Sequence, residues 1–333
     1  MRFSVTERGT YKRCRQQWDY ASHNRQGLEL LVQKPALSTG TLVHAAHAAW
    51  LSSPRVPLVD HFMMAANDEL TRIKAKYLTQ VGCNISDEEL TPLYESVEMG
   101  RAMCINYQKR WGQPLPDGFE LWAPEQTVIV PVPGTYHKCP VCEGEGTLPG
   151  DDTAPPSAQC TNCAGRGITM HELAGTFDGL MRDQKGRMWI LEHKTYKSRP
   201  NYEAMETNDQ FLAYIWILTQ LGVGTVAGVA YDGMWKRAEP PKGKTFEDLF
   251  LRMSITRPQY EIESFGRLLA LEINEMGSNP AIYLNRRWEG CFDCDFNKIC
   301  YATQRGEDVD YLTQRFYTKR DAKVGWGTPA EVE

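Results

Sequence analysis

The spacing of apolar and polar residues divides the chain into helical and strand-like segments. The pattern predicts two long helices over residues 58–112, with a break around residues 82–87. Strands and helices alternate after residue 118, which is typical of an α/β fold built on a mixed central sheet. Further helices are predicted over 40–50, 201–222 and 258–276, and strands over 119–133, 188–191, 225–231 and 249–255.

One stretch, residues 175–199, has the pattern of a β-hairpin. Residues 183–186 (Asp-Gln-Lys-Gly) supply a turn, with Gly where a positive φ is needed. If the loop is residues 184–186, so that Asp183 faces Arg187, counting outward places Asp178 opposite Glu192, and such pairs have Cβ atoms roughly 4.5–5.5 Å apart. Lys194 lies two residues beyond Glu192, so it projects from the same face. The hairpin therefore predicts two acids and a lysine at one point.

Two carboxylates this close repel each other unless a proton or a cation lies between them. Asp178 and Glu192 can hold Mg²⁺ through oxygen and leave positions for water and phosphate. Lys194 would supply positive charge beside a phosphate under attack. The same residues are also compatible with a surface hairpin whose charges are solvated, so the hairpin alone leaves both interpretations open.

Two copies of the pattern CxxCxGxG lie within residues 137–168. They supply Cys139 and Cys142, then Cys160 and Cys163. Four thiolates at this spacing predict a structural Zn²⁺ site, because four cysteines leave no open position for catalysis. The segment between the two copies is rich in Pro, Gly and Asp, which favours a loop tip. We expect the unit to be an insertion between two strands of the core.

A second cysteine group, CxxC followed by five residues and Cys, supplies Cys291, Cys294 and Cys300. Three thiolates need a fourth ligand, and Cys14 is the unassigned cysteine in a basic and aromatic context. Cys₄ chemistry alone allows zinc or iron. Without a metal, Cys14 would be a buried free thiol on an amphipathic helix. The two cysteines without a partner motif, Cys83 and Cys104, are expected to be unliganded small hydrophobes.

The composition is that of a soluble globular protein: 42% of the 333 residues are hydrophobic and 24% are charged. The net charge of −5 gives no global basic signature, so nucleic-acid binding would need a local basic patch. The first residues lack the apolar core of a signal peptide, and no apolar run reaches the length of a membrane span. We therefore interpret the ten cysteines as metal ligands and not as a disulfide framework. This interpretation predicts a reducing compartment, the cytoplasm of a bacterium, an archaeon or a phage-infected host.

The Asp178 and Glu192-His193-Lys194 steps resemble the core of PD-(D/E)XK nucleases. The order of the motifs resembles RecB-like nucleases that carry an iron–sulfur cluster, of the AddB and CRISPR-associated groups. This order comprises Cys14, Gly40 with His44, Asp178, Glu192-x-Lys194 with Gln210 and Tyr214, and Cys291, Cys294 and Cys300. The two CxxCxGxG copies resemble the zinc hairpins of DnaJ-type chaperones, but no J-domain motif is present, so a chaperone function does not follow.

The resemblance implies roles for individual residues. His44, Asp178, Glu192 and the carbonyl of His193 would hold Mg²⁺ or Mn²⁺. Gln210 and Tyr214 would orient Lys194 and the DNA backbone. Glu125 matches a glutamate that precedes the motif aspartate, and is equally compatible with a surface glutamate at a strand start. His47 matches no family position and is assigned to the structure. A [4Fe–4S] cluster would be held by Cys14, Cys291, Cys294 and Cys300.

We therefore expect a metal-dependent DNA nuclease, an exonuclease acting on single-stranded DNA or DNA ends in recombination, repair, phage replication or CRISPR-type processing. A recombination, helicase or CRISPR-adaptation partner is expected, and no membrane. One alternative is a catalytically silent nucleic-acid-binding or assembly protein on the same fold. Another is a different metal-dependent hydrolase with zinc at Cys291–Cys300. Candidates for contacts with the DNA backbone are Arg13, Arg15, Lys197 and Arg199.

The expected organisation follows from these motifs. It comprises an N-terminal helical part (1–118), a first core strand (119–136), the zinc hairpin (137–168), the nuclease core (169–283), the iron–sulfur motif (284–302) and a partly disordered tail (303–333).

Overall fold

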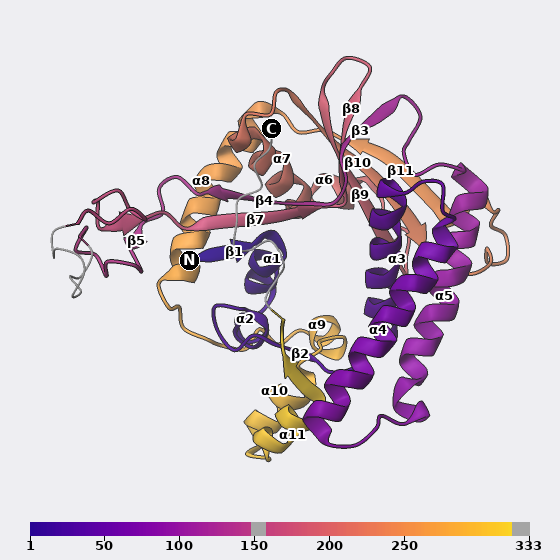
Figure 1. The fold of residues 1–333 in the computed structure, drawn as a ribbon, viewed down its shortest axis with the longest axis horizontal. Helices are drawn as coiled ribbons and strands as arrows, with labels where there is room; N and C mark the ends of the chain where they lie inside the picture. The colour runs from indigo at the N-terminus through magenta and orange to yellow at the C-terminus, as the bar shows by residue number, and fades with distance from the viewer. Residues whose placement is uncertain (148–157, 322–333) are drawn as a thin grey trace.

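A five-stranded mixed sheet forms the centre of the protein (Figure 1). The computed structural model describes residues 1–147 and 158–321. Within the sheet β9 and β10 are parallel, and the other neighbours are antiparallel. The strand order is β11 (Phe250–Ile255), β10 (Val226–Trp235), β9 (Met188–Tyr196), β8 (Gly179–Asp183) and β3 (Phe119–Ala123).

A three-stranded sheet continues from the first one. Its order is β1 (Arg2–Ser4), β7 (Glu172–Phe177) and β4 (Gln126–Pro131), with β1 parallel and β4 antiparallel to β7. The chain passes between the two sheets twice, from β3 to β4 around Glu125 and from β7 to β8 at Asp178. Both acids thus lie at places where a strand leaves one sheet for the other.

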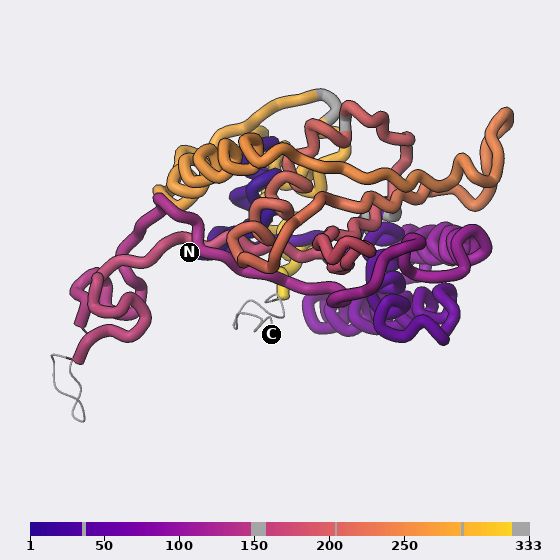
Figure 2. Tube along the Cα trace, turned by 90° about the horizontal axis from the view of Figure 1, so that it is seen from above, coloured from indigo at the N-terminus to yellow at the C-terminus, as the bar shows by residue number. Residues whose placement is uncertain are grey.

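Helices cover both faces of the five-stranded sheet, which explains why β9 is buried on both sides (Figure 2). Met188 and Ile190 pack into the core that includes α7 and α8, whereas Trp189 and Leu191 pack with Leu51 of α3. The helices of these layers are α3 (Pro35–Ser52), α4 (Leu58–Val81) and α5 (Asp87–Trp111) on one side, and α7 (Asp209–Leu221) and α8 (Gln259–Gly277) on the other.

The predicted pair of long helices is confirmed as α4 and α5. Gly82 ends α4 in the left-handed conformation, and Ser86 begins α5 with a capping box to Glu89. Gly100 of α5 lies against Phe62 of α4, where a Cβ would be 2.4 Å from the ring, so the two helices pack closely only because this residue is Gly.

Two predicted helices differ in detail. Helix α3 begins at Pro35, before Gly40, so Gly40 is not a break. A Cβ on Gly40 would lie 3.2 Å from Oγ1 of Thr195, and the Gly therefore permits close approach of α3 to β9. The helix predicted over 201–222 is two, α6 (Tyr202–Glu206) and α7, because Asn208 caps a new helix by accepting from the N–H of Gln210.

The segment with the two CxxCxGxG copies is an arm that leaves the core between β4 and β7 (Figures 1 and 2). At its base β5 (His137–Lys138) pairs antiparallel with β6 (Ile168–Thr169). Because β4 and β7 are antiparallel neighbours, the arm occupies the position of a long hairpin loop. The segment that the sequence predicted as an insertion thus lies between β4 and β7.

The two ends of the described chain are joined by a small unit of their own. β2 (Leu28–Leu30) pairs antiparallel with β12 (Tyr317–Lys319), and Tyr20, Phe296 and Tyr317 pack in one apolar cluster. Residues 303–319 are thus ordered, against the expectation of a tail from residue 303; residues 322–333 lie outside the described part. The helices of the unit are α2 (Arg15–Ala21), α9 (Trp288–Phe292), α10 (Asn297–Arg305) and α11 (Val309–Phe316), whereas α1 (Val5–Arg13) packs into the main core through Val5 and Tyr11. In the described ranges, no helix combines the length and apolarity needed to cross a lipid bilayer.

Candidate functional site

The hairpin β8–β9 has the register that its turn residues predict. The N–H of Asp183 donates to the carbonyl of Arg187 at 3.1 Å, and Gly186 has φ +74°. The ladder continues to the pair Gly179–Leu191 and ends there. Asp178 is therefore the first residue beyond the ladder, on the side where Glu192 lies.

The carboxylate of Asp178 is held from two directions. Its Oδ2 accepts the backbone N–H of His193 at 2.7 Å, and its Oδ1 lies 3.1 Å from Nδ1 of His44 on α3. The structure thus brings Asp178 together with the β9 backbone and with the histidine of the Gly-x-x-x-His step. Such fixed carboxylates favour a defined ligand geometry over a mobile surface charge.

Glu192 and Lys194 point from β9 toward α7. The ammonium of Lys194 forms an ion pair with Glu192, whose side chain is only 2% exposed. Gln210 lies with its Nε2 3.4 Å from Oε1 of Glu192, and donates to the hydroxyl of Tyr214 at 2.7 Å. Helix α7 approaches this closely because β7 has Gly175 beneath it, where a Cβ would be 2.7 Å from Ile217. All five residues of the predicted catalytic set therefore lie in one region.

The two acids titrate differently. Burial, reinforced by Asp178 and opposed by Lys194, raises the pKa of Glu192 to about 7. Burial also opposes ionisation of Asp178, but the charge and hydrogen bond of His44 outweigh it and lower the pKa of Asp178. Burial lowers the pKa of His44, yet Asp178 outweighs this effect and the net shift is upward. The two carboxylates thus titrate apart, and Glu192 keeps its proton to a higher pH than Asp178 does.

Glu125 adds a third acid to the site. Burial and then the charge of Asp178 raise the pKa of Glu125. The carboxylates of Asp178 and Glu192 and the imidazole of His44 fit a hard divalent ion such as Mg²⁺ or Mn²⁺ better than a soft metal. Among the described residues, only the four cysteines of the arm bring three or more possible ligand atoms within 4.8 Å of one another. The possible ligand atoms of the acidic site therefore lie farther apart than those of the arm.

The side chain of His193 lies on the opposite face of β9 and was expected to contribute only its carbonyl. It meets His47, whose role the sequence assigned to the structure, with ring centroids 4.1 Å apart. Behind them Tyr107 donates to Asp232, and Arg252 donates to the same carboxylate at 3.0 Å. The sequence analysis missed this buried network; the one signal was an Asp inside the apolar strand of residues 226–235.

The family assignment rests on an independent comparison. A sequence profile described as the PD-(D/E)XK nuclease superfamily matches residues 2–301. The chain belongs to this superfamily. Members are generally nucleases that use divalent metals, which agrees with the acids and histidine of the site. No curated protein matches the chain significantly. The crystal structure of SSO0001 aligns over 70% of this chain and 80% of its own, with 15% identity and a TM-score of 0.31, too low to carry an argument.

The basic residues proposed for DNA contacts are placed differently from one another in this PD-(D/E)XK protein. Arg15 pairs with Glu275 at 2.7 Å and stacks on Tyr11, so its charge serves the fold. Arg13 donates to Gln17, and Arg199 pairs with Asp248 at 3.1 Å. Lys197 is exposed at the end of β9.

Lys236, which the sequence analysis did not single out, lies beside this end of β9. Its backbone N–H donates to Tyr196 at 2.9 Å, and its Nζ would be 3.8 Å from a Cβ on Gly40. Burial, then the nearby charge of Lys197, lowers the pKa of Lys236. The position of a Lys directly after an apolar strand was the available signal.

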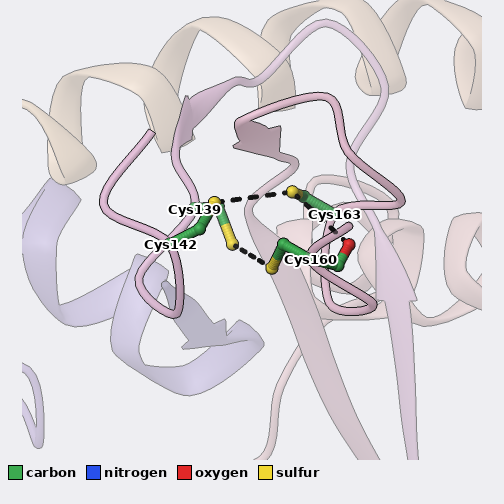
Figure 3. Close-up of side chains that lie close together, drawn as sticks. All are labelled: Cys139, Cys142, Cys160 and Cys163. Carbon is green, nitrogen blue, oxygen red and sulfur yellow. Dashed lines mark hydrogen bonds between the residues drawn. The ribbon is translucent and has the colours of Figure 1, made fainter. Parts of the chain in front are cut away.

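The four cysteines of the arm face one another across two loops (Figure 3). The Sγ atoms are 3.8 Å apart for Cys139–Cys160 and 3.7 Å for Cys142–Cys163. A tetrahedron with Zn–S bonds of about 2.3 Å has edges of about 3.8 Å, so the spacing fits a Zn²⁺ ion. Backbone N–H groups of Gly146 and Gly167 point to two of the sulfurs, at 3.2 and 3.3 Å. The geometry of these four cysteines therefore fits a metal site.

Four other cysteines lie at the junction of the two chain ends. Cys14 lies in an extended break between α1 and α2, and lines one cavity with Cys291, Cys294 and Cys300. Burial raises the pKa of Cys294 to about 11. Arg13, Arg286 and Arg287 line the same cavity and would offset thiolate charge. The one-plus-three set therefore lines one cavity, but among the described residues its sulfur atoms do not approach one another as closely as those of the arm cysteines.

The remaining two cysteines stand apart from both sets. Cys104 is buried in α5, as expected for a small hydrophobe, whereas Cys83 is exposed beyond the end of α4. Exposure of Cys83 does not fit a small hydrophobe, and it arises because the turn between α4 and α5 faces solvent.

Proposed function

We propose that this protein is a DNA nuclease of the RecB-like type that requires Mg²⁺ or Mn²⁺ and acts as an exonuclease on single-stranded DNA or DNA ends. The observation that carries the proposal is the convergence of His44, Asp178, Glu192 and Lys194. Two acids beside a lysine at a strand end suit phosphodiester hydrolysis. The partner in this proposal is DNA, in recombination, repair, phage replication or CRISPR-type processing.

Each residue has a role that its contacts support. Asp178, Glu192, His44 and the carbonyl of His193 would bind the divalent ion, which supplies Lewis acidity toward the phosphate and the attacking water. The ammonium of Lys194 would hold that water or stabilise the charge that develops on the phosphate. Gln210, fixed by Tyr214, would keep Glu192 and Lys194 oriented.

The substrate would be held through its backbone. Lys197, three residues beyond Lys194, directly follows β9, and Lys236 directly follows the neighbouring strand β10. Both are suited to the phosphates next to the scissile one. We include Lys236 because its amine is close to Gly40, one turn before His44 on α3.

The two cysteine sets would be structural. The arm would hold one Zn²⁺ through Cys139, Cys142, Cys160 and Cys163. The junction of the chain ends would hold a [4Fe–4S] cluster through Cys14, Cys291, Cys294 and Cys300, as in the RecB-like nucleases that it resembles.

The test is digestion of end-labelled single- and double-stranded DNA in Mg²⁺, Mn²⁺ or EDTA. Wild-type protein should degrade at least one substrate, and only with a divalent ion. Asp178→Ala and Glu192→Gln should be inactive, whereas Glu172→Ala, an acid of β7 that pairs with Arg2, should retain activity. Cleavage by a clean preparation of the Asp178→Ala, Glu192→Gln double variant would overturn the proposal.

A further inference from the structure

Two histidines are buried side by side directly behind the proposed metal site. His47 and His193 are each 1% exposed, and their rings are 4.1 Å apart with an angle of 36° between planes. None of their four ring nitrogens makes a hydrogen bond to any residue of the described ranges. Polar atoms buried without partners cost free energy, so a fold retains them where the ring itself has a use.

The stack joins the two elements that carry the proposed ligands. His47 follows His44 by three residues on α3, and residues three apart share a face of a helix. His193 lies between Glu192 and Lys194, and its N–H holds Asp178 at 2.7 Å. The contact between the rings therefore sets how far His44 lies from the β9 backbone.

Tyr107 and Asp232 pack against the two imidazole rings and restrict their movement. The ring of Tyr107 stands nearly perpendicular to that of His47, with centroids 4.5 Å apart. The Tyr107 hydroxyl donates to Asp232, whose Oδ2 lies 4.0 Å from Nδ1 of His193. Residues from α5 and β10 thus close the space around the two imidazoles.

We propose that His47 is a positioning residue whose ring, stacked on His193, sets the affinity of the site for its divalent ion. The inference rests on the proposed function, since it concerns the same ion. The effect on the affinity for the ion would come from the shape of the His47 ring and not from its nitrogen atoms. It also explains why an aromatic ring is present one turn beyond His44.

The experiment compares two apolar replacements in the full-length protein with its cysteine sites loaded. His47→Phe keeps a ring and His47→Leu removes it, and both remove the buried unpaired nitrogens. His61→Leu is the control, because His61 is a buried histidine of α4 that hydrogen-bonds to Ser53 and belongs to a different contact. Mn²⁺ affinity is measured by electron paramagnetic resonance and by calorimetry, with unfolding temperature as a second reading.

His47→Leu should raise the Kd for Mn²⁺ about 10-fold or more, the scale of losing a group that supports a ligand. His47→Phe and His61→Leu should remain close to wild type. With saturating Mn²⁺, His47→Leu should recover most of its cleavage rate, since the chemistry of the site is intact. An equal loss in the Phe and Leu variants, or none in either, would overturn the role of the ring.

A failure of the proposed function would be recognised separately. If wild-type protein binds no Mn²⁺ in the presence of loaded cysteine sites, or if Asp178→Ala binds it equally well, the metal site itself is wrong. Normal binding by wild type that is lost in Asp178→Ala, together with unchanged affinity in His47→Leu, would reject only the inference about the stack.

Discussion

The Nδ1 of His44 lies 3.1 Å from the Oδ1 of Asp178, although 134 residues separate them along the chain. The contact joins α3 to the point where the chain leaves β7 for β8. It also links their titration, because it raises the pKa of His44 and lowers that of Asp178. A histidine and a carboxylate held in this way are suited to share one divalent ion.

His44→Ala should therefore weaken the response to metal more than it affects folding. The substitution removes a proposed ligand and the charge that keeps Asp178 ionised. The Mn²⁺ concentration for half-maximal cleavage should rise by more than the roughly 10-fold cost of losing a supporting group. Cleavage of end-labelled DNA across a Mn²⁺ titration measures this; a curve that superimposes on wild type would exclude His44 from the site.

Lys194→Ala should slow cleavage and leave metal binding in place. Loss of one electrostatic stabiliser in an active site costs roughly 10²–10³-fold in rate. Gln210→Ala should cost less, because Gln210 contacts Glu192 at the long distance of 3.4 Å and orients charged groups. Single-turnover rates at saturating Mn²⁺ measure both; a larger loss in Gln210→Ala than in Lys194→Ala would reverse the assigned roles.

The hairpin could be predicted because local chemistry determines its register. With the loop placed at residues 184–186 and Asp183 facing Arg187, one alignment follows, and the structure has it. The arm cysteines were predictable for the same reason, since CxxCxGxG is a local pattern. The pair of long helices followed from their pattern and from the break near Gly82.

What could not be predicted depends on contacts distant in sequence. Strands β1 and β2 have three residues each, too few for a period to be visible. The network of Tyr107, Asp232 and Arg252 takes one residue from each of three elements. The burial of His47 against His193 also arises only when α3 packs on β9.

The glycines of the arm should be as necessary as its cysteines. A Cβ on Gly167 would be 2.2 Å from the carbonyl oxygen of Gly144, and a Cβ on Gly146 would be 2.4 Å from that of Gly165. Both also have positive φ, which other residues rarely adopt. Gly146→Ala and Gly167→Ala should release Zn²⁺ to a chelator faster than Glu145→Ala, the control on the same loop. Equal release rates would show that the two backbones can separate.

The two cysteine sets should take up metal independently. Anaerobically purified protein should be brown, with about four irons and about one zinc per chain, as two Cys₄ sets imply. Cys14→Ser should lose iron and keep zinc, whereas Cys160→Ser should do the reverse. Elemental analysis and the visible spectrum measure this. Colourless, iron-free protein with two zincs would exclude the cluster.

Loss of the iron set should also destabilise the junction of the chain ends. Lys34, at the start of α3, donates to the carbonyls of Asp293 and Cys294 at 3.0 Å. Cys300→Ser should therefore lower the unfolding temperature and the soluble yield. The apolar cluster around Tyr20 and Phe296 should keep part of the junction folded. A variant as stable as wild type would show that the set is not structural.

The anchor of α11 on the long helices should depend on pH. Glu89 accepts from Tyr77 and from Arg315 of α11, each at 2.6 Å, and these bonds outweigh burial to hold the pKa of Glu89 at about 2. Because this pKa lies below the ordinary value of 4.5, the contribution to stability is present above about pH 4.5 and is lost as the pH falls toward 2.

Glu89→Gln should thus lower the free energy of unfolding by up to about 1 kcal/mol at pH 7, the scale of a partly exposed ion pair. The deficit should shrink at pH 3. Urea unfolding at the two pH values measures it, with Glu88→Gln on the exposed side of α5 as the control, and a deficit that grows on acidification would show that the ionised Glu89 does not stabilise this contact.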